Sequence, residues 1–394
     1  MLAELVRRAL IVAFAVVMLL FALISIRSIA LNLAQHDIWS NDFFGIWSFA
    51  RFTTVHAAAT IYNDTAIHDF QVDLGSVPTY YLPCPYPPSF LLLIAPLGFL
   101  SYYAAYAVWI FVTFALYFII SVWRQERRLG AFLVVLAPAS VVTFASGQTG
   151  FLTSALIVGG LRFAGPRPIL GGILLGLATV KPQLGLLVPI ALIAARLWRA
   201  TAAAGATAAL LVLASTAAFG WQAWPLWLGK LAGHADWAAG VASRYTVTIL
   251  GNLTLLGVGL TAARIVQGGV ALLVAAGLWL CCRRGLTARS AAAVLVGTFL
   301  ATPYAFVYDT PMVTNAALAA IGDRRRRPLG IAEILIIGTA LILPVIIAMT
   351  WRLSMLRSLP LLFLFGLIVW GVLQSQDRQP IPAAGHSRNL AATR

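Results

Sequence analysis

Charge is scarce in this sequence: Asp, Glu, Lys and Arg make up 10% of its 394 residues, whereas 61% are hydrophobic. A water-soluble fold needs more polar surface than this to cover its interior. The composition therefore excludes an ordinary soluble domain and indicates a protein that lies in lipid. Uninterrupted apolar stretches such as 10–26 and 331–351 reach the roughly 20 residues that cross a bilayer core.

Lysine is nearly absent, because only Lys181 and Lys230 accompany the 25 arginines that complete the 27 basic residues. The net charge of +15 comes from arginines in short groups between apolar segments, which is a topology signal rather than a nucleic-acid patch. We expect these groups in the cytoplasm, where they also contact anionic lipid headgroups, and no nucleic-acid partner. The groups fall at 7–8, 123–128, 162–167, 196–199, 283–289 and 323–327.

With these groups inside, the sequence predicts an all-α bundle of roughly 12 crossings, with both termini in the cytoplasm. Residues 1–30 are expected to be a retained first span rather than a cleaved signal, within a single transmembrane domain over 1–373. The polar tail 374–394 is expected to be disordered in the cytoplasm. The outward turns then fall at 30–87, 147–150, 181–183, about 220–247 and 302–309, and a final pair of spans at 329–350 and 355–373.

Two segments do not fit this arrangement of membrane crossings. Counting 88–100 as a full crossing would place the arginines at 123–128 outside, so this short segment is expected to be a re-entrant or shallow helix. The segment 246–262 has the same problem. The small residues of GGILLG, at 171–176, predict close packing between helices.

Several motifs are missing as well. The three cysteines have no spacing that suggests zinc, and we expect no disulfide. There is no glycine-rich loop for nucleotide phosphates, no D-x-D pair for the metal of a nucleotide sugar, and no sizeable cytosolic domain. Any donor substrate should therefore be a lipid. No internal repeat of the kind found in many transporters is evident.

The acidic residues concentrate on one side, since seven of the 12 fall outside in this topology. Asn41 or Asp42 precedes an aromatic-rich amphipathic stretch, with Trp39 and Trp47, which predicts the N-cap of a helix in the membrane interface. Asp42 is either only this cap or also a general base whose basicity is raised by partial desolvation. The seven outer acids are Asp37, Asp42, Asp64, Asp69, Asp73, Asp236 and Asp309.

Further polar residues at the outward turns are candidates for substrate binding. Lys181 either extends to the interface, recognises a phosphate, or forms a structural ion pair with Asp309. Gln148 either caps a span or belongs to the site. Tyr308 lies on the same face, and Tyr86 is a further candidate from the first loop.

Two outer arginines, Arg51 and Arg244, break the positive-inside pattern. They either contact headgroups or use their fork geometry to bind a phosphate. The outer histidines His36, His56, His68 and His234 have no metal-binding spacing and stay unassigned.

The order of several segments between about 35 and 320 resembles glycosyltransferase family 87, a bacterial membrane family. This family includes the polyprenol-phosphate-mannose-dependent mannosyltransferase of phosphatidylinositol mannoside synthesis. The segments are NDFFGIW (41–47), YNDTAIHDFQ (62–71), YPPSFLLLIAPLGFLS (86–101), GQTGFL (147–152), GGILLGLATVKPQLG (171–185) and TPYAFVYD (302–309).

The resemblance implies a GT-C fold with a catalytic carboxylate early in a long first outer loop of about 30–87. It also implies a polyprenyl-phosphate-sugar donor, a lipid or glycan acceptor and an inverting displacement on the outer face of the bacterial cytoplasmic membrane. Asp42 matches the family's loop aspartate, and Gln148 and Lys181 match its GQ and K-P positions. Where mannosyltransferase members carry a histidine near the last outer turn, this chain has Phe306, Tyr308 and Asp309.

The mechanism expected from these parts has Asp42 taking the proton of the acceptor hydroxyl, while Lys181 and Arg244 stabilise the phosphate that leaves. It requires no cofactor, although a divalent metal ion is compatible with it. The alternatives are a transporter or flippase of lipid-linked sugars, and a non-catalytic scaffold protein of envelope synthesis in which Asp42 only caps a helix.

Overall fold

The computed structural model describes residues 2–35, 41–79, 81–122, 127–240, 243–322, 328–349 and 357–377, and these residues are overwhelmingly helical. They contain no strand, only one isolated antiparallel bridge between Thr246 and Phe306. The α-helices of the first half are α1 (Leu2–Gln35), α2 (Phe43–Val55), α3 (Asp64–Asp73), α4 (Pro88–Ile94), α5 (Tyr102–Val122), α6 (Arg127–Leu136), α7 (Pro138–Ser146), α8 (Gly150–Phe163), α9 (Pro168–Leu177) and α10 (Val188–Ala194).

The second half continues the bundle, with short 3-10 turns at the breaks. Its α-helices are α11 (Trp198–Phe219), α12 (Ala223–Gly240), α13 (Ile249–Leu255), α14 (Leu260–Cys282), α15 (Ala288–Ala301), α16 (Pro311–Gly322), α17 (Ile331–Leu341), α18 (Leu343–Met349) and α19 (Leu359–Asp377). The 3-10 turns are η2 (Ala58–Tyr62), η3 (Ala95–Phe99), η4 (Ala178–Val180), η5 (Pro182–Gly185), η6 (Ser243–Tyr245) and η7 (Val307–Asp309).

Four described helices are long and apolar enough to cross a membrane, and a fifth span results if the bent pair α17 and α18 is counted as one. The four are α1, over its residues 2–27, α5, α11 and α14. The other apolar helices, 10 to 17 residues long, include the α4–η3 segment predicted to be re-entrant or shallow. The expected all-helical membrane fold is confirmed, whereas the total of roughly 12 crossings stays a prediction.

Proline and polar caps set where many helices begin. Pro88, Pro138 and Pro168 stand at the first helical position of α4, α7 and α9, where a missing backbone N–H costs nothing. The Asn63 side chain accepts hydrogen bonds from two backbone N–H groups of α3, and Thr287 forms a capping box with Ser290 at α15.

The GGILLG segment packs as its small residues predict. A Cβ on Gly172 would lie 2.5 Å from the carbonyl oxygen of Ala200, and one on Gly176 would lie 2.5 Å from Cβ of Thr207, both on α11. On the other side, a Cβ on Gly171 would lie 2.4 Å from the backbone nitrogen of Ala164, just after α8. Helix α9 is therefore held tightly between α8 and α11 because it lacks side chains there.

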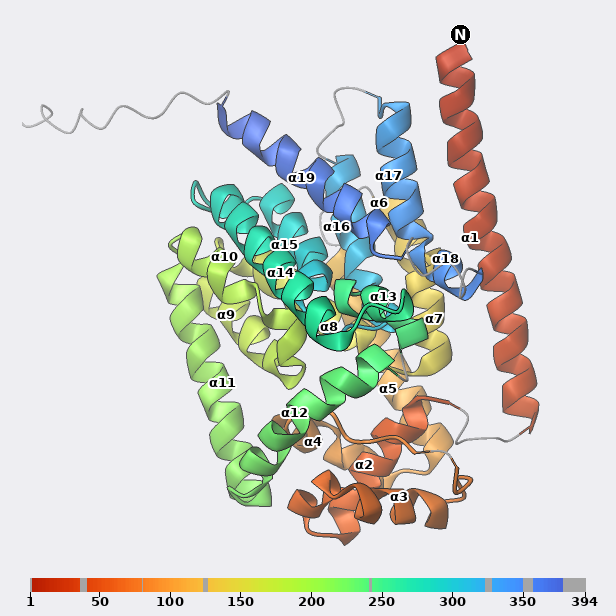
Figure 1. Cartoon of the computed structure of the whole chain (residues 1–394), viewed down its shortest axis with the longest axis vertical. Helices are drawn as coiled ribbons and strands as arrows, with labels where there is room; N and C mark the ends of the chain where they lie inside the picture. The colour runs from red at the N-terminus through yellow and green to blue at the C-terminus, as the bar shows by residue number, and fades with distance from the viewer. Residues whose placement is uncertain are drawn as a thin grey trace, which may run out of the picture.

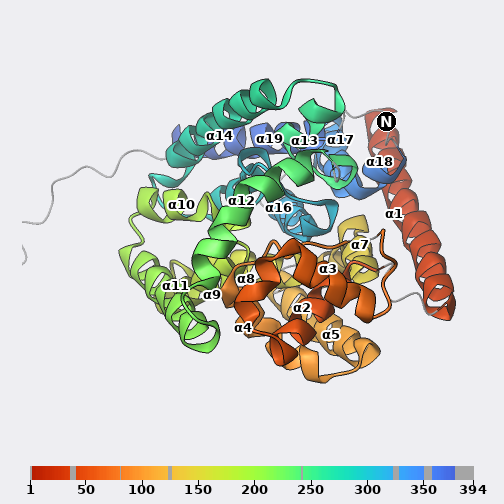
Figure 2. The same ribbon diagram turned by 60° about the horizontal axis from the view of Figure 1, so that its bottom comes forward.

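The two ends of the described chain and the long first outer loop lie at opposite ends of the molecule. Figure 1 shows the start of α1 and the end of α19 at the top, and α2, α3 and α4 at the bottom. Figure 2, with that bottom turned forward, shows α12 running from the end of α11 towards α13, while α1 stands at the outer edge beside α18. This arrangement agrees with both ends of the described chain lying on one side of a membrane.

Two predicted segments differ from the structure. The span expected at 329–350 is broken, because α17 and α18 meet at a bend of 63°. Residues 246–262, which did not fit as a full crossing in the sequence, contain the seven-residue α13 and only the start of α14 and form no span. The tryptophan-rich segment at about 220–247 is mostly the helix α12 rather than a loop.

Several predictions fall outside the described residues. These concern His36, Asp37 and Trp39, most of the arginine group at 123–128, the group at 323–327, part of the last span at 355–373 and the tail beyond residue 377.

Candidate functional site

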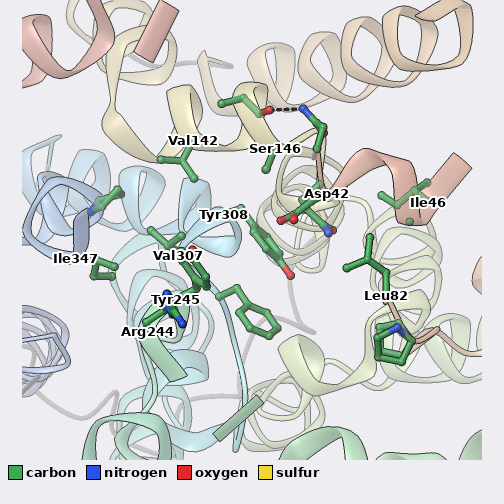
Figure 3. Close-up of a pocket in the computed structure, with 18 of the residues that line it drawn as sticks. Asp42, Ile46, Leu82, Val142, Ser146, Arg244, Tyr245, Val307, Tyr308 and Ile347 are labelled. Carbon is green, nitrogen blue, oxygen red and sulfur yellow. Dashed lines mark hydrogen bonds between the residues drawn. The ribbon is translucent and has the colours of Figure 1, made fainter. Parts of the chain in front are cut away.

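The outward turns predicted from the sequence meet around one pocket of about 1030 Å³. The start of α2, the turn after α7, the helix α12, the turn η6 and the turn η7 each contribute lining side chains. Figure 3 shows Asp42 and Tyr308 facing the pocket, with Arg244 and Tyr245 across it from Asp42. Segments more than 260 residues apart in the sequence, such as those of Asp42 and Tyr308, therefore form one site.

Asp42 is free to face this pocket because its neighbour Asn41 caps helix α2. The Asn41 side chain accepts the Phe43 backbone N–H at 2.9 Å and donates to the carbonyl oxygen of Ala145, at the end of α7, at 2.7 Å. Asp42 makes no side-chain capping bond, although it stands at the capping position. The interpretation of Asp42 as only a helix cap is therefore wrong, and Asn41 provides the cap.

The surroundings of Asp42 make its carboxylate more basic than usual. Desolvation by burial raises the pKa of Asp42 from 3.8 to about 6, and a hydrogen bond with Gln148 opposes part of this rise. Gln148 is in turn held by the hydroxyl of Tyr86, which donates to its Oε1 at 3.0 Å. The Tyr86 ring is fixed against Phe90 at 4.1 Å between ring centroids. Three predicted site residues, Asp42, Gln148 and Tyr86, thus form one connected set.

Two glycines allow this set to assemble. Gly147 ends α7 with a φ of +65°, and a Cβ there would lie 2.5 Å from Cβ of Phe43. A Cβ on Gly150 would lie 1.8 Å from the carbonyl oxygen of Tyr308. A side chain at either position would push the Gln148 turn away from α2 or from η7.

Lys181 does not line the main pocket, because it is engaged by Asp309. Its Nζ lies 2.6 Å from Oδ1 of Asp309 and 3.1 Å from Oγ1 of Thr149, and both charged side chains are almost fully buried. Asp309 also accepts the backbone N–H of Phe306 at 3.0 Å. The ion pair considered for these two residues is therefore confirmed, and Lys181 lies next to the Tyr308 ring, 5.0 Å from its centroid.

Arg244 is the only lysine or arginine among the described residues that line the main pocket. It is exposed, and its guanidinium lies 5.8 Å from the centroid of the Tyr245 ring. Its carbonyl oxygen accepts a 2.7 Å hydrogen bond from the buried Arg357, and Val247 pairs with Ala305 just beyond η6. These contacts fix the backbone that presents Arg244 beside η7.

Helix α12 adds two residues that sequence reasoning left unassigned. His234 and Trp237 line the main pocket, their rings stack at 5.2 Å, and His234 meets Tyr304 at 5.0 Å. Burial and the nearby positive charge of Lys181 lower the pKa of His234 to about 4, so this histidine is neutral near pH 7. The spacing of three residues between His234 and Trp237 on a helix was the signal that could have found them.

A salt bridge and a hydrogen bond tie α12 to the first outer loop. Lys230 of α12 lies 2.5 Å from Asp64, which also accepts a hydrogen bond from Tyr81. The indole of Trp227 donates to the carbonyl oxygen of Pro85 at 3.1 Å. These contacts hold α12 over the same loop that carries Asp42 and Tyr86.

Arg51 is not brought to the pocket. Its side chain donates to the carbonyl oxygen of Gly98 at 3.0 Å, and it does not line the pocket that contains Asp42. Among the described residues, no three His, Cys, Asp or Glu side chains cluster as metal ligands.

The arrangement combines a basic carboxylate, one exposed cation and aromatic walls in a pocket at one end of a membrane-embedded helical bundle. A base near a cation is suited to taking a proton from a hydroxyl while an anionic group leaves. Fold and site together suit a membrane-bound enzyme of the transferase class.

Comparison with known protein families also indicates a membrane-bound transferase. The profile of glycosyltransferase family 87 matches residues 85–303, which is 219 of the 394 residues. The chain belongs to glycosyltransferase family 87 and is a membrane glycosyltransferase. No curated protein and no solved structure matches it.

The matched range includes Tyr86, Gln148, Lys181 and Arg244 but ends before Tyr308 and begins after Asp42. The position of Asp42 in the site therefore depends on the geometry of the pocket rather than on the family match.

Proposed function

We propose that this glycosyltransferase transfers a hexose, with mannose as the preferred sugar, from a polyprenyl-phosphate donor to a lipid or glycan acceptor. The proposed site of action is the outer face of a bacterial cytoplasmic membrane. The observation that carries the proposal is the half-buried Asp42 carboxylate, with its pKa raised to about 6, in a pocket at the end of the bundle opposite to both ends of the described chain. A sugar joined to a lipid phosphate needs such a surface site, because its carrier stays in the bilayer.

In the proposed reaction, Asp42 takes the proton of the acceptor hydroxyl as its oxygen bonds to the anomeric carbon. The bond from that carbon to the phosphate oxygen breaks, and the phosphate departs with the electron pair, which inverts the anomeric centre. Gln148 orients the carboxylate through their hydrogen bond, and Tyr86 fixes Gln148. A base with a pKa near the working pH is favourable for this role.

Arg244 is the residue we assign to the leaving phosphate. A polyprenyl phosphate leaves as an anion, and a guanidinium binds phosphate oxygens through paired N–H groups. Lys181, expected to share this role, is neutralised by Asp309. We assign Lys181 and Asp309 to positioning the turn that carries Tyr308. No step of this mechanism requires a metal ion.

The test is transfer of radiolabelled sugar from synthetic polyprenyl-phosphate hexoses to membrane lipids by purified wild type and Asp42→Asn. We expect Asp42→Asn to lose about 10²- to 10⁴-fold in rate, the usual contribution of a general base. Its thermal stability should match wild type, because Asp42 makes no capping bond.

Asn41→Ala is the matched control, since it removes the cap of the same helix and should lower the free energy of unfolding by about 1 kcal/mol. Equal transfer by wild type and Asp42→Asn would refute the base. Absence of transfer from every donor by folded wild type, with acceptor lipids supplied, would favour a transporter of lipid-linked sugars.

A further inference from the structure

The pocket has an apolar side that the reaction above does not use. Its lining there consists of Phe21 and Ser25 of α1, Pro344, Ile347 and Ala348 of α18, and Val142 of α7. Figure 3 shows Ile347 and Val142 on one side of the pocket, with Asp42 on the other. Five of these six side chains carry no polar group, so this side offers a sugar few hydrogen bonds.

The two helices that form this side face the bilayer. Helix α1 buries Met18 and Ala22, whereas Leu19 and Leu23, which directly follow them, are 47% and 56% exposed. At the end of α18, Ala348 is exposed and Met349 is 77% exposed. Because exposed apolar side chains on a membrane span contact lipid, the apolar side of the pocket borders the hydrocarbon region.

The helices beside this apolar side of the pocket are interrupted by a bend between α17 and α18. Helix α1 packs on α7 and α17, and the chain then bends by 63° between α17 and α18. Figure 2 shows α1 and α18 next to each other at the outer edge of the molecule. The bend turns α18 towards the pocket, where Ile347 and Ala348 reach the lining.

The carboxylate, the cation and the apolar side chains occupy different parts of the pocket. Asp42 is the carboxylate, Arg244 is the only described lysine or arginine in the lining, and Ile347 belongs to the apolar side. In Figure 3, Arg244 and Ile347 both lie across the pocket from Asp42. A base on one side of the pocket, with a cation and hydrocarbon-facing side chains on the other, suits a molecule in which a sugar, a phosphate and a lipid chain are joined in that order.

We propose that the pocket opens sideways into the bilayer between α1 and α18, and that the isoprenoid chain of the donor lies in this opening. The identity of the occupant rests on the proposed function. The donor then reaches the site without leaving the membrane: its phosphate stops at Arg244, and its sugar extends to Asp42. The acceptor approaches from the opposite side, past the first outer loop.

The first experiment blocks the opening. Ala348→Trp and Ser25→Trp place an indole in it, and Leu23→Trp puts the same side chain on the outer face of α1 as the matched control. Each variant is assayed with a long-chain polyprenyl-phosphate sugar and with a water-soluble short-chain analogue of the same sugar phosphate.

We expect Ala348→Trp to raise KM for the long-chain donor at least about tenfold and to leave KM for the short-chain donor near the wild-type value. Leu23→Trp should behave as wild type with both donors. An equal effect on both donors, or an effect on neither, would overturn the proposal. Ala348 is exposed, so its replacement should not prevent folding.

A second experiment does not depend on catalysis and so separates this proposal from the proposed function. A long-chain polyprenyl phosphate without a sugar, carrying a photoreactive group in its chain, is cross-linked to the wild-type protein in phospholipid vesicles. We expect labelled peptides from 18–27 and 343–349, and loss of labelling on adding unlabelled polyprenyl phosphate.

Labelling confined to other lipid-facing surfaces, such as Leu272 and Leu273 of α14, would refute the opening even if the enzyme transfers sugar. Equal competition by an ordinary diacyl phospholipid would also refute it, because the opening would then take the acceptor or bulk lipid. Wild type that transfers no sugar but gives the expected labelling would refute only the proposed function.

Discussion

At the scale of the single residue, Asn41 caps helix α2 and its neighbour Asp42 faces the pocket. A residue at a helix N-terminus that bonds the backbone N–H groups has its oxygens occupied, whereas one that makes no such bond can meet a substrate. Asn41 takes the first role and thereby leaves the Asp42 carboxylate in the pocket. The neighbouring Gln148 and Tyr86 then hold that carboxylate without neutralising it.

The raised pKa of Asp42 predicts the pH dependence of the reaction. A base acts only when deprotonated, so kcat/KM should be constant above about pH 7 and half-maximal near pH 6. Below that pH it should fall about tenfold per pH unit. An Asp42 carboxyl with its ordinary pKa of 3.8 would instead keep full activity at pH 5.

Replacing Gln148 provides the control for this assignment. Its hydrogen bond lowers the pKa of Asp42, so Gln148→Met should move the midpoint of the pH profile upward. A midpoint that is unchanged in Gln148→Met would mean that another group titrates in the profile.

At the scale of the element, the turn η7 depends on a buried ion pair between distant segments. Lys181 follows α9 and η4, and Asp309 ends η7, yet their charged groups lie 2.6 Å apart with almost no exposure. Asp309 also bonds the Phe306 backbone N–H, and Thr143 donates to the Tyr308 carbonyl oxygen at 2.8 Å. The pair thus fixes the backbone that presents Tyr308 to the pocket.

Breaking this pair should destabilise the protein, because one charge would stay buried without its partner. We expect Lys181→Met to lower the free energy of unfolding by about 3–5 kcal/mol. The double variant Lys181→Met with Asp309→Asn should recover part of that loss, since the introduced amide would carry no charge and its oxygen would still accept the Phe306 N–H. Thermal denaturation of the purified variants in detergent measures the stability of the single and of the double variant.

A phosphate-binding Lys181 would behave differently. Lys181→Met would then keep the wild-type stability and raise KM for the donor, and the second substitution would restore nothing.

At the scale of the whole molecule, the polar turns lie at one end of the bundle and the two ends of the described chain lie at the other. Figure 1 places α2, α3 and α4 opposite the start of α1 and the end of α19. The arginine groups predict that the latter end is cytoplasmic. The pocket with Asp42 would then open on the outer surface.

This orientation can be measured by cysteine labelling, because Cys84, Cys281 and Cys282 are all buried. In intact cells, a membrane-impermeant maleimide should label an Asp73→Cys variant, at the exposed end of α3, and not a Gly165→Cys variant, between α8 and α9. Both positions are exposed, and a Cβ on Gly165 meets nothing within 4 Å. Labelling of Gly165→Cys in intact cells, with Asp73→Cys protected, would reverse the orientation.

The sequence by itself determined the all-helical membrane fold, since uninterrupted apolar runs of this length cross lipid as helices, which pair their backbone groups within the segment. It also identified the family and the segments that carry Asp42, Gln148, Lys181 and Tyr308, because arginine groups and polar turns mark where the chain changes direction. Small residues at 171–176 predicted correctly where helices pack closely.

Only the tertiary structure decided how those segments are used. Lys181 and Asp309 are 128 residues apart, and whether a buried charge meets a phosphate or a carboxylate depends on which turn packs against it. Likewise, Asn41 rather than Asp42 caps α2, Arg51 lies away from the pocket, and His234 reaches it from α12. A sequence specifies which side chains are available, but their partners follow from long-range packing, which local pattern does not encode.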